Sequence, residues 1–210
     1  MSSIIERVLL TQAPSEARAF LQRAFDRAPS DWMTSFALAA RKLPREPLAV
    51  GDAEELAWLF SSSPFSEAAR VALLLRMSAL QSDLPGVLAE CFRQGDNGEK
   101  RAVLRSLALM PKPETLVEVG TFGCRTNVVT VFEAIACENP FPARYFPEPS
   151  FNQMVLKAVF VGVSLSRVMG LNERLNPDLS RMAHDYAAER RAAGRSVPSD
   201  LELIVEGGRP

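Results

Sequence analysis

Apolar residues recur at three- and four-residue intervals along most of the chain, and this spacing predicts an all-α protein. The expected helices form successive pairs of about 30 residues, near the period of helical-hairpin repeats. The pairs cover residues 14–43, 52–81, 83–110 and 112–137. We therefore predict an irregular helical-hairpin array of the HEAT-like or α-solenoid-like type.

Polar residues and prolines mark where these helices should begin. Polar side chains cap the free amides of the first turn, and proline is tolerated at the first helical position. The expected starts are Ser15, Ser30, Asp52, Ser63-Pro64, Asp83, Asp96 and Thr126. Gly95 is an expected end, since glycine commonly stops a helix.

The most apolar stretch runs from residue 151 to residue 162 and contains one charged side chain, Lys157. Ser150, just before this stretch, and Gln153, within it, fit the S-x-x-Q capping box of a helix start. A helix that is apolar around most of its girth must be covered on most sides. We expect this segment to be the buried central helix onto which the hairpins wrap.

Proline dominates the segment before that helix, residues 139–149, which also holds three aromatic side chains. Four prolines favour an extended path, and the aromatics should pin it to the surface. Beyond the central helix, Asn176-Pro177 predicts a helix that continues to about residue 193. The predicted parts are N-terminal helical repeats (1–120), a second helical region of the same globular unit (121–195) and a C-terminal tail expected to fray unless its apolar residues dock (196–210).

Charge and cysteine content narrow the functional classes. The formal net charge is −1, from 24 basic and 25 acidic residues, so nothing favours nucleic acid or an anionic membrane. Three cysteines without C-x-x-C spacing argue against a disulfide framework and favour a reducing compartment. The N-terminal residues lack the pattern of a signal peptide. We expect a cytoplasmic protein.

A membrane span is not expected either. The best window, residues 154–171, contains Lys157 and Arg167, and a lysine near the centre of a span is expensive.

Catalytic and metal-binding patterns are weak. His184 is the single histidine and is expected to be a surface or half-buried side chain that makes one hydrogen bond, with a ligand contact or proton carrier as the alternative. No metal site and no cofactor are predicted, because neither paired cysteines nor Glu-x-x-His motifs occur. Gly120 to Asn127, with Arg125 between, could hold an anion at a helix N-terminus or form an ordinary turn.

Lys157 is the sharpest anomaly, since a buried ammonium must be paired or lose its proton. We predict that it is largely buried and paired with Glu133 or with an acid of the 177–194 helix, for which Asp185 is the preferred candidate. A structural ion pair is favoured over a functional lysine. The side chains that could line one polar pocket are Arg125, Asn127, Glu133, Asn152, Lys157, His184 and Asp185.

The second half of the chain resembles the EboA family of bacterial and algal-plastid proteins. The resemblance is carried by Cys124–Asn127, Val131–Ala136, Asn139–Ala143 with Tyr145-Phe146, Phe151–Ala158, Gly170-Leu171 through Leu179, and Asp185–Arg195. It implies a setting beside a UbiA-like prenyltransferase and a TatD-like hydrolase. It also implies secondary metabolism, with a link to export of a scytonemin precursor in cyanobacteria.

Two functions from different classes follow. The first is a non-catalytic accessory protein that binds pathway enzymes or a small-molecule intermediate. The alternative is an enzyme of isomerase or lyase type, acting on an intermediate in a pocket around Lys157, Glu133 and the His184/Asp185 pair. Convergence of these side chains on one cavity would favour the enzyme.

Overall fold

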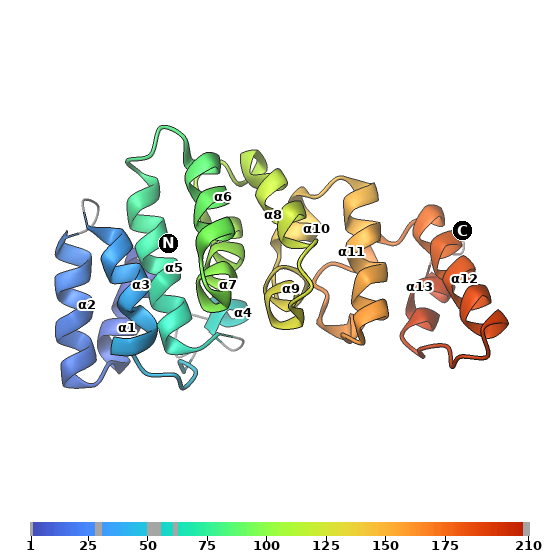
Figure 1. The fold of residues 1–210 in the computed structure, drawn as a ribbon, viewed down its shortest axis with the longest axis horizontal. Coiled ribbons are helices and arrows are strands. Elements are labelled where there is room, and N and C mark those ends of the chain that lie inside the picture. The colour runs from blue at the N-terminus through green and yellow to red at the C-terminus, as the bar shows by residue number, and fades with distance from the viewer. Residues whose placement is uncertain (1, 28–30, 50–55, 61–62, 208–210) are drawn as a thin grey trace. The chain divides into compact units, whose positions relative to one another are not determined.

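The computed structural model describes residues 2–27, 31–49, 56–60 and 63–207, and its named elements are all helices (Figure 1). The all-α prediction is confirmed. The chain forms two compact units, residues 1–135 and 136–210. The expected caps Ser30 and Asp52 lie outside the described residues.

The first unit contains the longer series of helices. They are α1 Ser2–Gln12, α2 Ser15–Arg27, α3 Trp32–Lys42, α4 Ala57–Phe60, α5 Phe65–Ser78, α6 Leu84–Gln94, α7 Asn97–Ser106, the 3₁₀ turns η2 Leu107–Leu109 and η3 Pro113–Leu116, α8 Val117–Gly123 and α9 Val129–Ala136.

Helix α5 is the centre of this unit. It contacts α1, α2, α3, α4 and α7 (Figure 1). All of its residues except Arg76 are buried. Its run from Val71 to Leu75 explains the position, because a helix without a polar face must be covered on most sides. This is the buried central helix that the sequence had placed at residues 151–162.

A buried carboxylate links α5 to α7. Glu67 is 3% exposed and accepts hydrogen bonds from Ser63 at 2.8 Å and from Arg101 Nε at 2.6 Å. Arg105 Nε lies 3.8 Å from the same carboxylate, and its side chain is 2% exposed. A carboxylate can leave water only where such partners replace its hydration, so this cluster fixes the register of the two helices.

Two helices of this unit begin at their predicted caps, whereas α2 begins at Ser15 itself. Asp83 accepts from the Gly86 amide, and Asp96 forms a reciprocal capping box with Glu99. Gly95 ends α6 as expected. At Ser63-Pro64 the start is displaced by one residue, since Pro64 takes the cap position and α5 begins at Phe65.

The second unit is smaller. It contains α10 Phe141–Tyr145, α11 Glu148–Val161, the turns η4 Leu165–Arg167 and η5 Asn172–Arg174, α12 Pro177–Ala192 and α13 Leu201–Gly207. Asn176 caps α12 by accepting from the Leu179 amide, as its sequence predicts. The C-terminal segment does not simply fray, because α13 packs on α12 and buries Leu201 and Ile204.

The proline-rich segment is not extended, and this prediction is wrong. Pro142 and Pro149 occupy the first turns of α10 and α11, where a missing amide proton breaks no helical hydrogen bond. Helix α11 therefore begins at Glu148 with Pro147 as its cap, before the predicted Ser150/Gln153 capping box.

Helix α11 is amphipathic instead of surrounded. Its buried residues, Phe151, Asn152, Met154, Val155, Ala158 and Val159, share one face, while Phe160 is 71% exposed. The helix ends at Gly162, whose φ of 77° is a left-handed cap.

The HEAT-like repeat is not confirmed. Helix α1 packs on α5, although it precedes residue 14 and belongs to none of the predicted helix pairs. In the described part of the chain, no helix combines the length and apolar character needed to cross a bilayer.

Candidate functional site

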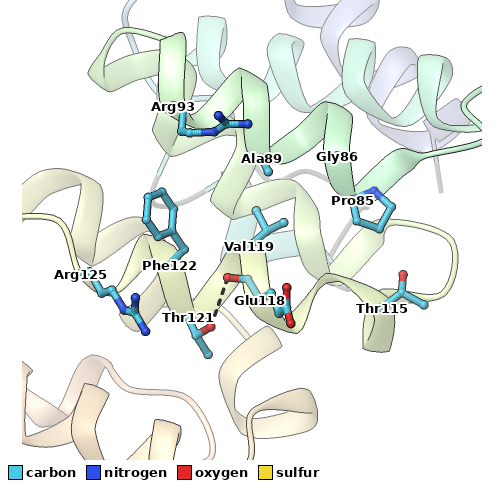
Figure 2. Close-up of a pocket in the computed structure, with 10 residues that line it drawn as sticks. All are labelled: Pro85, Gly86, Ala89, Arg93, Thr115, Glu118, Val119, Thr121, Phe122 and Arg125. Atoms are coloured by element: carbon cyan, nitrogen blue, oxygen red, sulfur yellow. Dashed lines mark hydrogen bonds between the residues drawn. The ribbon is translucent and has the colours of Figure 1, made fainter.

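A groove of about 580 Å³ lies between α6 and α8 in the first unit (Figure 2). Helix α6 contributes Pro85, Gly86, Ala89 and Arg93, and the chain from η3 past α8 contributes Thr115, Glu118, Val119, Thr121, Phe122 and Arg125. The volume falls in the range of small-molecule sites.

Residue spacing explains why the groove is open. Small side chains recur along one face of α6 at Gly86 and Ala89, three residues apart. They leave room beside Val119 and Phe122 of α8. The ring of Phe122 packs edge-on against Phe92 at 5.7 Å between centroids, yet 44% of the side chain stays exposed.

The two ends of the groove differ in charge. Figure 2 shows Phe122 between Arg93 and Arg125 at one end, with Pro85 and Thr115 at the other. Arg93 pairs with Glu90, but both side chains are more than half exposed, at 57% and 52%. Such a pair contributes about 0–1 kcal/mol, so a ligand can compete for the guanidinium.

The hydroxyl groups of the groove are committed to the backbone. Thr121 Oγ1 donates to the Glu118 carbonyl at 3.1 Å, and Thr115 Oγ1 donates to the Lys112 carbonyl at 2.8 Å. A nucleophilic hydroxyl needs a base within hydrogen-bond reach, and a carbonyl oxygen is not one. These contacts support binding more than covalent chemistry.

The glycine-containing stretch before α9 is not an anion loop. Gly120 and Gly123 lie inside α8, where their missing side chains permit close packing. A Cβ at Gly123 would meet Leu104 Cδ2 at 2.5 Å. Thr126 Oγ1 accepts from the Val128 amide two residues ahead, in the turn before α9.

The seven residues predicted to line a pocket are divided between the units. Arg125, Asn127 and Glu133 belong to the first unit, and Arg125 is the one that lines the groove. Asn127 is exposed, and Glu133 is half-buried on α9. The other four belong to the second unit: Asn152, Lys157, His184 and Asp185.

Asn152 has a structural role. It is 2% exposed and exchanges two amide hydrogen bonds with Asn176, at 3.1 and 3.0 Å. Because Asn176 also caps α12, this pair ties α11 to the start of α12.

Replacing Asn152 with alanine should lower the free energy of unfolding by about 1–3 kcal/mol, since Asn176 then loses a buried partner. Urea unfolding of Asn152→Ala, Asn176→Ala and the double variant measures the coupling energy between the two residues. We expect a coupling energy of about 0.5–3 kcal/mol, and additive effects would contradict the link.

Of the remaining predicted residues, Lys157 is less buried than expected. Lys157 is half-buried on α11, and His184 and Asp185 are exposed on α12. Asp185 pairs with Arg181 one turn earlier, at 3.4 Å. Glu133 lies in the other unit from Lys157, and their pairing stays a prediction.

Other residues that carry the family resemblance also stabilise the second unit. Arg174 donates to the carbonyls of Ala143 and Phe146 at the end of α10, at 2.7 and 2.9 Å. Its guanidinium lies 4.7 Å from the centroid of the Phe151 ring. The arginine therefore satisfies carbonyls that α10 leaves open.

Cys91, on α6, is not an activated thiol. Burial raises its pKa to about 11, and the negative charges of Glu99 and Glu90 add to the rise. The thiolate is the reactive species, so the side chain is chemically quiet near neutral pH.

At pH 8 we expect iodoacetamide to alkylate Cys91 about 100-fold more slowly than a cysteine of pKa 9.0, because two pKa units separate them. The free energy of unfolding should fall as the pH rises from 9 to 11. In that range the Cys91 thiol ionises in the unfolded chain, where its pKa is 9.0, but stays protonated in the folded protein. Peptide mapping separates Cys91 from Cys124 and Cys137. A rate that levels off near pH 9 in the folded protein would contradict the raised pKa.

Sequence reasoning missed most of the groove. Arg93, Phe122 and the small residues of α6 were not singled out. The available signal was the pair of small residues Gly86 and Ala89, which lie on one face of α6. Small residues on a helix face form a groove only where another helix packs beside them, and the sequence does not show that α8 is that neighbour.

The chain matches the sequence model of a protein family described as Metabolite traffic protein EboA, over residues 7–206. No curated protein and no solved structure matches it.

Proposed function

Because this chain belongs to the EboA family of metabolite traffic proteins, we propose that it is a non-catalytic accessory protein that binds a small molecule and passes it on. The groove between α6 and α8 is the proposed binding site. The observation that carries the proposal is the combination of a ligand-sized volume and a floor of apolar side chains bordered by polar and charged ones in that groove.

The proposal extends to the setting of the protein. The family resemblance favours a bacterial secondary-metabolite pathway, with a prenylated or scytonemin-like precursor as the molecule carried. The same resemblance favours pathway enzymes, prenyltransferase-like and TatD-like, as donors or acceptors of that molecule. We propose that the protein works in the cytoplasm.

Mass spectrometry of small molecules extracted from the natively purified protein tests the binding role. We expect one compound, or one chemical series, to be retained by the wild type. Ala89→Trp, which fills the floor of the groove, should lower the retained amount about tenfold or more, the change expected for a loss of roughly 1.4 kcal/mol.

Ala188→Trp is the matched control, since Ala188 is exposed on α12 in the other unit. It should retain the compound as the wild type does. A wild-type protein that retains nothing, or a compound retained equally by both tryptophan variants, would contradict the proposed site.

A further inference from the structure

We infer that the molecule bound between α6 and α8 is an apolar anion, with its acidic group at the Arg93–Arg125 end and its apolar body along Phe122, Val119 and Ala89. This inference rests on the proposed function and names the chemical class of its ligand.

Charge complementarity carries the first step. Arg93 lies in the last turn of α6 and Arg125 two residues after the end of α8, and the two arginines line the groove on either side of Phe122 (Figure 2). Planar guanidinium groups bind carboxylate and phosphate oxygens in bidentate fashion. The acid named is therefore a carboxylate or a phosphate.

The apolar surface beside the arginines carries the second step. Phe122 lies between them and keeps 44% of its side chain exposed, although an aromatic ring gains free energy when it is covered. Val119 and Ala89 continue this surface away from the arginines. An apolar body attached to the acid would cover the ring while a guanidinium group beside it holds the head.

Glu118 fixes the orientation. Its carboxylate lines the groove and would repel an acid bound beside it. A carboxylate or phosphate head is therefore directed toward the two arginines, and the opposite end suits a neutral or hydrogen-bond-donating group.

The arginines also have a simpler role, because a cation near a helix C-terminus stabilises the helix dipole. Arg41, an exposed arginine in the last turn of α3, shares that role but lies outside the groove. It provides the matched control for the experiment.

The test uses three probes with one aromatic body: 1-naphthoate, 1-naphthyl phosphate and the neutral 1-naphthalenemethanol. Calorimetric titration gives their Kd values for the wild type, Arg93→Gln, Arg125→Gln, the double variant and Arg41→Gln. We expect at least one acid to bind about tenfold more tightly than the alcohol, and the carboxylate and phosphate arms identify which.

Each groove variant should weaken binding of that acid about fivefold to tenfold, and the double variant should bind it no better than the alcohol. Arg41→Gln should match the wild type. Equal binding of all three probes, or unchanged acid binding in the double variant, would overturn the inference. Retention of a neutral compound by the native protein would also overturn it while leaving the proposed function standing.

Discussion

Replacing Glu67 with alanine is expected to lower the free energy of unfolding by about 3–5 kcal/mol, one of the largest effects of any single substitution in the chain. The Glu67 carboxylate is buried, and Arg105 is buried beside it. Removing the carboxylate leaves that cation out of water without its negative neighbour, while Arg101 loses a bond of 2.6 Å. Urea unfolding followed by circular dichroism measures the change.

A matched substitution separates the effect of losing a buried carboxylate on stability from the effect of losing an exposed one. Glu90→Ala removes a carboxylate from the Arg93 pair, whose side chains are more than half exposed, and should change stability by about 0.5 kcal/mol or less. If Glu67→Ala were as mild as Glu90→Ala, the Glu67 cluster could not be what fixes α5 against α7.

Gly170→Ala is the second large effect, with an expected loss of roughly 2–5 kcal/mol. Gly170 has a φ of 70°, where an L-residue costs roughly 1–2 kcal/mol. A Cβ there would also lie 2.5 Å from the Cβ of Ala143, and relieving such overpacking costs roughly 1–3 kcal/mol. Thermal and urea unfolding measure the loss.

Gly162→Ala provides the control for backbone strain alone. Its φ is 77°, but nothing lies within 4 Å of the added Cβ, so we expect only the roughly 1–2 kcal/mol of the left-handed conformation. Equal losses at the two glycines would show that the approach to Ala143 adds nothing.

Local sequence signals predicted the helix boundaries where capping is local. Asp83, Asp96 and Asn176 each accept a hydrogen bond from the amide three residues ahead, and that chemistry is visible in the sequence. The prolines of residues 139–149 misled the prediction because proline opposes a helix interior and favours a first turn. Which of the two applies depends on where the helix starts.

Burial was harder to predict than helix position. The run at residues 151–162 is more apolar than α5, yet α5 is the covered helix and α11 leaves Phe160 in solvent. Helix α5 buries two charged residues, Glu67 and Arg70, and a charge is buried only where a partner compensates it. Their partners Arg101 and Glu99 lie more than 25 residues away, so only the packed structure shows that these charges are neutralised.

The candidate site shows the same limit. Of the residues selected for chemistry, Arg125 lines the groove, and Asn152 turned out to join two helices. The groove is made by residues 85–93 and 115–125, and no short-range pattern states that these segments are neighbours.

Photocrosslinking in the producing cell tests the central claim most directly, namely that a small molecule occupies the groove between α6 and α8. A diazirine side chain is placed at Thr115, on the exposed rim of the groove, and in a second protein at Ala188 as the control. We predict a covalent adduct of small-molecule mass at position 115 that is absent at position 188. No adduct at 115, the same adduct at both positions, or only protein-sized adducts at 115 would contradict the claim.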